Sequence, residues 1–138
     1  MTPADGPPEP WPAQWLRGVL DLAVLAVIAR GQTYGYRIGN DLRELGLGTV
    51  KGGTLYPLLA RLEEIGAVAT TWREGESGPG RKWYEITPTG RDRLLQEGAR
   101  WRTFARLTSE LTNEPDTGTT SAAAPEPTPR TLDAGAQR

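Results

Sequence analysis

Between residues 51 and 62, a few polar and cationic side chains are interspersed with leucines that recur at helical spacing. Leu55, Leu58, Leu59 and Leu62 form an apolar stripe, so this segment is expected to be a helix with the leucines facing inward. On or near the opposite side, toward the helix N-terminus, lie Lys51, Gly53, Thr54, Tyr56, Pro57 and Arg61. Such a helix fits a DNA major groove about 12 Å wide, with its N-terminal side chains at the base edges. A capped surface helix whose glycines only form a turn is the alternative.

Two other groups could bind the sugar-phosphate backbone of a nucleic acid. Arg81 and Lys82 follow a glycine-rich segment that is expected to be a hairpin tip, from which cations reach phosphates or the minor groove. Tyr34, Gly35 and Tyr36 begin another expected helix, where a hydroxyl or a terminal N–H could meet a phosphate. The alternatives are an ordinary solvated hairpin and, for Tyr34, a core position beside Ile38.

The composition excludes several other kinds of site. The 138 residues include no His and no Cys, so thiolate or imidazole metal sites, disulfides, Cys nucleophiles and Ser-His-Asp triads are ruled out. The carboxylates Glu63, Glu64, Asp41 and Glu44 are expected on solvated helix faces near basic partners. We therefore expect no enzyme, no metal and no cofactor.

The elements that must position these residues follow a recognisable order. We expect helices at about 15–30 and 34–45, the second capped by Thr33, and then the leucine-striped helix, with Thr54 as N-cap and Pro57 at its third position. Strands are expected at 68–73 and 81–86, with Trp72 and Trp83 covering the core. Thr87 then caps a long helix that starts at Pro88 and runs to about Leu111. The expected fold is mainly α with a small β-hairpin, a winged helix-turn-helix followed by a C-terminal helix.

Three sequence motifs in this order resemble the PadR family of transcriptional regulators, over about Leu16 to Trp101. In chain order they are the Tyr34-Gly35-Tyr36 triplet, the segment from Gly53 to Gly66, and the segment from Gly78 to Thr87. Tyr34 stands where many members have His, and Trp83 where many have Tyr. The resemblance implies a homodimer with one terminal dimerisation helix that binds operator DNA and is often released by a small effector.

The C-terminal helix carries more apolar residues than a small core can cover. With the apolar first helix, it suggests a two-fold dimer interface made of Leu16, Val19, Leu94, Trp101, Phe104, Leu107 and Leu111. Packing within one chain is the alternative. Some family members that sense flat aromatic compounds are similar in having Trp on these two helices, so Trp15 and Trp101 are candidate effector-binding residues. Simple interface packing is the alternative for both.

The charge and proline distributions suggest four segments. Residues 1–12 and 114–138 are rich in proline and poor in large apolar residues, and are expected to be disordered. Residues 13–86 would form the DNA-binding domain and residues 87–113 the dimerisation helix. Residues 11–113 carry 14 basic and 11 acidic side chains, a mildly basic balance. No apolar run is long enough for a membrane span and no signal peptide is visible, so a cytoplasmic protein is expected.

Together these features predict a dimeric, sequence-specific DNA-binding repressor that is released by a small aromatic or hydrophobic effector. A winged-helix module that binds a partner protein through the same surface is the second hypothesis. The two differ in salt dependence, because phosphate contacts release counterions when DNA binds.

Overall fold

The computed structural model describes residues 11–75 and 78–113 of the chain. The segments expected to be disordered therefore lie outside the described residues, except for Trp11 and Pro12. The chain divides into two compact units, Met1–Arg102 and Thr103–Arg138, which are described separately. In the second unit the described part is residues 103–113, and it is helical up to Thr112.

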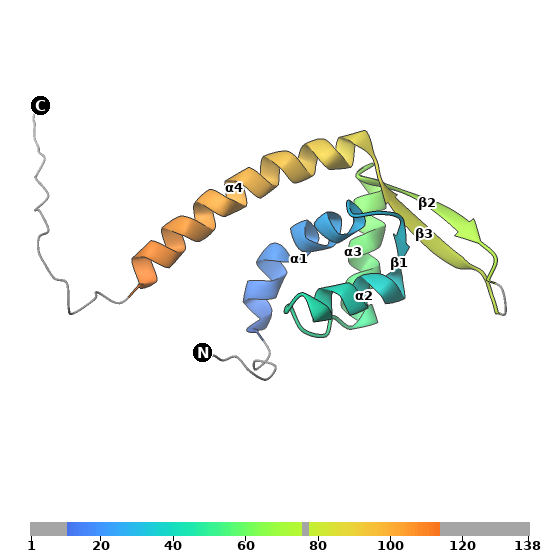
Figure 1. The fold of residues 1–138 in the computed structure, drawn as a ribbon, viewed down its shortest axis with the longest axis horizontal. Coiled ribbons are helices and arrows are strands. Elements are labelled where there is room, and N and C mark those ends of the chain that lie inside the picture. The colour runs from blue at the N-terminus through green and yellow to red at the C-terminus, as the bar shows by residue number, and fades with distance from the viewer. Residues whose placement is uncertain (1–10, 76–77, 114–138) are drawn as a thin grey trace, which may run out of the picture. The chain divides into compact units, whose positions relative to one another are not determined.

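Within the described residues, four helices and three short strands follow one another (Figure 1). They are α1 (Ala13–Ile28), β1 (Thr33–Tyr34), α2 (Gly35–Glu44), α3 (Gly52–Glu64), β2 (Val68–Arg73), β3 (Arg81–Ile86) and α4 (Pro88–Thr112). This confirms the expected fold of three helices, a β-hairpin and a long C-terminal helix. The hairpin bounds agree with the prediction, whereas α1 begins and ends two residues early.

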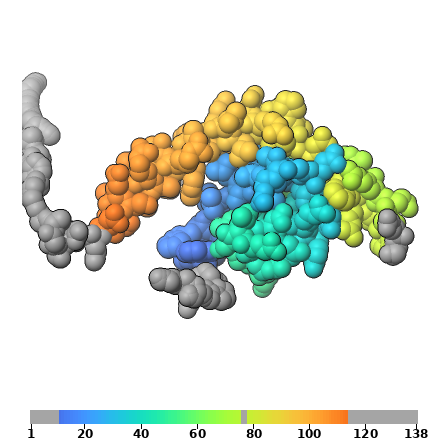
Figure 2. Space-filling model, viewed as in Figure 1, coloured from blue at the N-terminus to red at the C-terminus, as the bar shows by residue number. Residues whose placement is uncertain are grey.

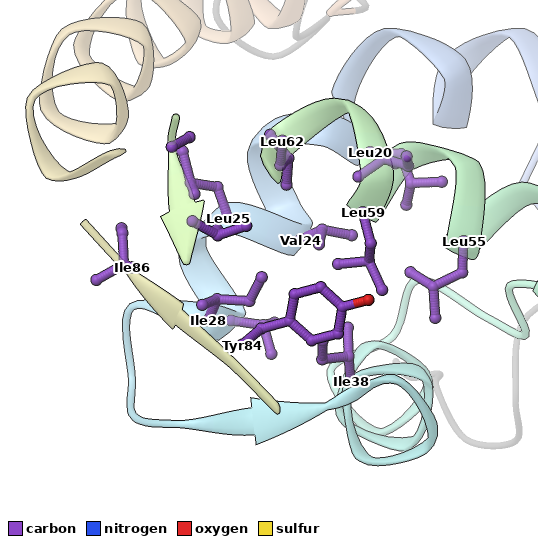
Figure 3. Packing of buried hydrophobic residues seen from close by; sticks show 14 of the residues in the cluster. Leu20, Val24, Leu25, Ile28, Ile38, Leu55, Leu59, Leu62, Tyr84 and Ile86 are labelled. Carbon is purple, nitrogen blue, oxygen red and sulfur yellow. The ribbon is translucent and has the colours of Figure 1, made fainter. Parts of the chain in front are cut away.

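One apolar core holds the first unit together. Helices α1, α2 and α3 and the sheet each contribute buried side chains, and Figure 3 shows them converging around the ring of Tyr84. Val24, Ile38 and Leu59 are fully buried, one from each helix. In the space-filling view the surfaces of α1 and α2 lie directly against each other (Figure 2). The leucine stripe of α3 faces this core as predicted, since Leu55, Leu58, Leu59 and Leu62 are all buried.

The sheet has one strand more than the sequence predicted. Its order is β1-β3-β2, fully antiparallel, with Thr33 opposite Tyr84 and Tyr34 opposite Trp83. Thr33 therefore does not cap α2. It lies in β1 with a buried side chain, and Tyr34 is the N-cap residue. The two-residue strand brings the start of α2 to the edge of β3.

Successive residues of the hairpin point to opposite faces of the sheet. Tyr84 and Ile86 point into the core, whereas Arg81 and Trp83 point to the other face. Trp72 shares the core-side face but lies beyond the core, and 68% of its surface is exposed. The expectation that Trp72 and Trp83 cover the core is thus wrong, because Trp72 is largely exposed and Trp83 lies on the opposite face of the sheet.

Helix α3 begins earlier than the sequence suggested. Its N-cap is Lys51, whose carbonyl accepts hydrogen bonds from the N–H groups of Thr54 and Leu55, both at 2.9 Å. Thr54 is therefore a residue of the first turn, not the cap, and Pro57 lies inside the helix. Because proline has no N–H, Pro57 cannot bond the carbonyl of Gly53, four residues earlier. The first turn of α3 therefore lacks this one i,i+4 hydrogen bond.

The junction between the hairpin and α4 is tightly packed around Thr87. The Thr87 hydroxyl accepts a hydrogen bond from the Gly90 N–H at 3.0 Å and lies 2.6 Å from the Gly66 carbonyl oxygen. This confirms Thr87 as the N-cap of α4. Gly90 is buried against the preceding chain, and a Cβ atom added there would lie 2.0 Å from the Ala67 carbonyl oxygen. The start of α4 is therefore fixed against the segment that joins α3 to β2.

We expect Gly90→Ala to destabilise the protein by about 1–3 kcal/mol, the usual cost of overpacking a buried site. The obstructing atom belongs to the backbone, so no side-chain rotation can relieve the clash. Urea unfolding followed by circular dichroism measures the change.

The matched control is Gly39→Ala, another glycine within a helix, where an added Cβ meets nothing within 4 Å. It should leave stability unchanged or raise it by up to about 1 kcal/mol, because alanine favours helices. Equal stability of the Gly90→Ala variant and the wild type would contradict the packing described for this junction.

Candidate nucleic-acid interface

The side of α3 that faces away from the core is fully exposed. Each residue predicted there is exposed: Lys51, Gly53, Thr54, Tyr56, Pro57 and Arg61. The helix therefore presents the predicted face to solvent, and its two flanks border two separate hollows.

The first hollow, here called the wing hollow, lies between α3, the start of α2 and the hairpin. It has a volume of ≈ 530 Å³ and brings together six of the predicted site residues. These are Tyr34, Gly35, Tyr36, Tyr56, Arg81 and Lys82, joined by Ala60, Trp72 and Tyr84. Tyrosines and cationic residues from β1, α2, α3 and β3 thus line one concave surface, a set of groups that suits a phosphate or a base edge.

Gly35 has a packing reason to be glycine. A Cβ atom there would lie 2.2 Å from the Tyr56 hydroxyl, because the Tyr56 ring lies over the start of α2. This contact connects α3 to the N-terminus of α2. The structure therefore places Gly35 beneath a candidate binding side chain, with its own backbone buried.

Tyr84 and Glu63 set the electrostatics of the inner wall of the wing hollow. Burial raises the pKa of the Tyr84 hydroxyl, and Glu63 and Tyr56 raise it further, so Tyr84 stays protonated and able to donate a hydrogen bond. The Glu63 carboxylate accepts a hydrogen bond from the Thr70 hydroxyl at 2.9 Å and lies 3.3 Å from the Lys82 ammonium. Glu63 therefore lies near a basic partner, as the sequence analysis expected, and the positive charge of Lys82 is partly neutralised.

The second hollow, the α1 hollow, borders the other flank of α3. It has a volume of ≈ 490 Å³ and includes Lys51, Thr54 and Arg61 among its lining residues, with Arg17 and Asp21 from α1. One nitrogen of Arg61 lies 3.0 and 3.2 Å from the two carboxylate oxygens of Asp21. The predicted DNA-binding residues are therefore split between two flanks, and Gly53 and Pro57 line neither of these two hollows.

Arg37 and Arg73 are cations that the sequence analysis did not single out. Arg37 lies on α2 directly after Tyr36, and Arg73 pairs with Arg81 across the hairpin. Both guanidinium groups lie close to the ring of Trp83. The cross-strand pairing of Arg73 with a predicted site residue was the signal that could have found it, once the hairpin register was known.

The predicted dimer and effector residues have different degrees of exposure. Leu16, Val19, Leu94 and Trp101 are partly buried, and Leu94 packs against the core. Phe104, Leu107 and Leu111 are exposed, Leu111 to 85%. Trp15 is 59% exposed and its ring lies 6.1 Å from that of Trp11, whose indole N–H donates to the Gly46 carbonyl at 2.8 Å.

Within residues 11–75 and 78–113, no group of three or more carboxylate, imidazole or thiolate side chains could hold a metal ion. The same part of the chain contains no helix long and apolar enough to cross a membrane.

Comparisons with known proteins agree with this geometry. The model of the family described as "Transcriptional regulator PadR-like family" matches residues 24–96. A protein of Lysinibacillus sphaericus described as "Uncharacterized protein X" is 31% identical over 88 residues, which is 62% of this chain and 81% of that protein.

Solved structures give the same result. A PadR family transcriptional regulator from Eggerthella lenta is 34% identical, with a TM-score of 0.65 over 73% of this chain and 89% of that one. A PadR-like transcriptional regulator from Bacillus cereus is 31% identical, with a TM-score of 0.64 over 73% of this chain and 99% of that one. The family match spans α2, α3, the whole sheet and part of α1, and so covers the elements that form the wing hollow. The chain therefore belongs to the PadR-like family of transcriptional regulators, which are not enzymes.

Proposed function

We propose that this regulator is a homodimeric repressor that reads operator DNA with α3 and is released by a small effector. The observation that carries the proposal is the exposed face of α3, with Tyr56 on one flank, Arg61 of the last turn on the other, and a buried leucine face behind it. A buried leucine face fixes the helix rotation, so the exposed side chains can enter a major groove without rearrangement of the core.

In this proposal the two flanks of α3 have different tasks. Tyr56 and the wing hollow face the DNA strand that runs along the hairpin, and Arg81 and Lys82 contact the phosphates of that strand. Arg61, Thr54 and Lys51 reach the opposite side of the groove. Arg61 gives up Asp21 when it binds a base or a phosphate, and because this ion pair is exposed its loss costs only about 0–1 kcal/mol.

The exposed apolar residues near the end of α4 support dimerisation. Phe104, Leu107 and Leu111 follow one another at i, i+3 and i+7, on one side of the helix. An apolar stripe of this kind is expected to be covered by a second copy. The other proposed interface residues are Leu16, Val19, Leu94 and Trp101.

Trp15 and Trp101 are the proposed effector-binding residues. Trp15 supports this role because its indole is largely exposed beside Trp11, where a flat guest could stack. Packing of both residues in the dimer interface without an effector is the competing hypothesis.

We predict that Tyr56→Ala weakens specific operator binding by about 1–3 kcal/mol, the usual value of one base contact. Binding to a scrambled duplex should change less, and a gel-shift titration with both duplexes measures the difference. Tyr56→Phe separates the hydroxyl from the ring, since it keeps the packing on Gly35. Wild-type discrimination by the alanine variant would refute the role of α3 as the recognition helix.

A charged residue in the apolar stripe should separate the dimer. We expect Leu107→Glu to sediment as a monomer under conditions where the wild type is a dimer, because the carboxylate would have to be buried without a partner. Ser109→Glu adds the same charge to an exposed position of the same helix and should leave the dimer intact. Equal masses for Leu107→Glu and wild type would place the interface elsewhere.

Trp101→Ala should weaken the binding of flat aromatic compounds, because an indole ring that stacks on such a compound contributes roughly 0.5–1.5 kcal/mol beyond the area that it buries. Isothermal titration calorimetry of wild type and variant with a panel of planar dyes measures this. Trp72→Ala removes an exposed indole from the hairpin and serves as control. If neither wild type nor variant binds any compound of the panel, the packing hypothesis for Trp15 and Trp101 is favoured.

A further inference from the structure

Three arginines surround two neighbouring aromatic rings on the outer face of the sheet. The Cζ atom of Arg73 lies 4.1 Å from the ring centre of Trp83, and that of Arg81 lies 4.2 Å from the ring centre of Tyr34. Arg37 has its Cζ 5.6 Å from Trp83 and 5.1 Å from Tyr34. The two ring centres are 4.9 Å apart. We call Arg37, Arg73, Arg81, Tyr34 and Trp83 the arginine stack.

The strand register creates this arrangement. Tyr34 is opposite Trp83 in the β1–β3 pair, and Arg73 is opposite Arg81 in the β2–β3 pair. Because side chains alternate along each strand, these four residues share the face of the sheet opposite to Tyr84. Arg37, in the first turn of α2, reaches the same two rings from the helix. Three elements therefore contribute guanidinium groups to one surface.

A guanidinium group that lies over a ring uses its face for that contact, while its N–H donors point along its edge. The edges stay available for the paired hydrogen bonds that guanidinium makes with phosphate. One donor of Arg73 bonds the Gln32 side-chain oxygen, and Gln32 in turn donates to Glu85 at 2.8 Å. Most donors of the three arginines are therefore not used by these side-chain bonds.

The charges of the arginine stack lack acidic partners within the described part of the chain. The ion pairs found there join Arg61 to Asp21, Lys82 to Glu63 and Arg93 to Glu97, and none includes Arg37, Arg73 or Arg81. All three of these arginines are exposed. Three like charges held on two rings repel one another, and a polyanion that binds them relieves this repulsion.

The arginine stack is continuous with the wing hollow. Tyr34 and Arg81 belong to both, so the stack begins where the predicted interface ends. A DNA strand that contacts Arg81 at the hairpin has Arg37 and Arg73 as its next cationic neighbours. Neighbouring phosphates along one strand present the repeated negative charge that three neighbouring guanidinium groups can match.

Building on the proposed DNA-binding function, we propose that the arginine stack binds consecutive phosphates of the DNA backbone outside the base pairs that α3 reads. Arg37 and Arg73 are then additional phosphate-contacting residues, and Trp83 is the platform that orients them. These contacts would add affinity for any DNA sequence and fix the orientation of the hairpin on the duplex.

The test compares the salt dependence of operator binding by the full-length wild type and by the double variant Arg37→Gln with Arg73→Gln. The slope of log K against log salt should decrease by about 0.9 for each phosphate that is no longer neutralised, so by up to about 1.8 for the two arginines. Discrimination between operator and scrambled duplex should stay at the wild-type level. A second double variant, Arg37→Lys with Arg73→Lys, keeps the charges but loses the planar groups, and its affinity should fall between the other two.

Arg91→Gln with Arg100→Gln is the control, because it removes the same two charges from exposed positions of α4. Its slope should stay at the wild-type value. If the Arg37 and Arg73 glutamine variant keeps the wild-type slope, the phosphate proposal is wrong and the stack is free to bind an acidic protein. If the lysine variant binds like the wild type, the role of the planar stack is wrong. Failure of the wild type to bind any duplex would instead overturn the proposed function itself.

Discussion

The register of β3 is the constraint on which the wing hollow and the arginine stack both depend. Tyr84, only 5% exposed, and Ile86 anchor the strand in the core, among side chains of all three preceding helices. A shift of one residue would bring Trp83 and Arg81 to the core side and expel Tyr84. Burial of Tyr84 and Ile86 thus determines that Arg81 lies on the outer face of the sheet, although Arg81 is not part of the core.

The same strand connects the core to both neighbouring elements of the interface. On one edge it holds β1 and so the start of α2, and on the other it holds β2 and the exposed Trp72. Beyond Ile86 the chain passes through the Thr87 cap into α4. A displacement of α4 at its first turn would therefore act on β3 directly, which mechanically couples α4 to the candidate nucleic-acid interface.

The basic groups of this surface are not equivalent. Lys82 and Arg61 lie against carboxylates, so their charge is balanced within the protein. The arginine stack has no such balance in the described residues, and its cations lie on aromatic rings instead. A net charge close to zero for the whole sequence therefore conceals a surface on which positive charge is locally concentrated.

Local patterns predicted the helices, the hairpin and the cap of α4, because each depends on residues close together in the sequence. The leucine stripe identified the inward face of α3, and Thr87-Pro88 marked the start of α4. Strand β1 was missed because two residues have no periodicity and Thr33 has the chemistry of a helix cap. The start of α3 was misplaced because Pro57 was assigned to the first turn.

The candidate site was predicted in its parts but not in its grouping. The sequence indicated tyrosines and cations at the correct elements, yet it could not show that Arg61 turns to Asp21 while Tyr56 turns to the wing hollow. Arg37 and Arg73 were missed because their partner rings lie on other elements, and such contacts exist only after the sheet has paired.

The placement of the five tryptophans has a spectroscopic consequence. None belongs to the buried core of the described residues, whose large aromatic ring is that of Tyr84. Trp11, Trp15 and Trp72 are exposed, and Trp83 lies under the Arg73 guanidinium. Trp101 is partly buried on α4, so the indole emission of the native protein comes from residues outside this core. Intrinsic tryptophan fluorescence therefore reports on the outer surfaces of this molecule, and Tyr84 is the tyrosine that reports on its interior.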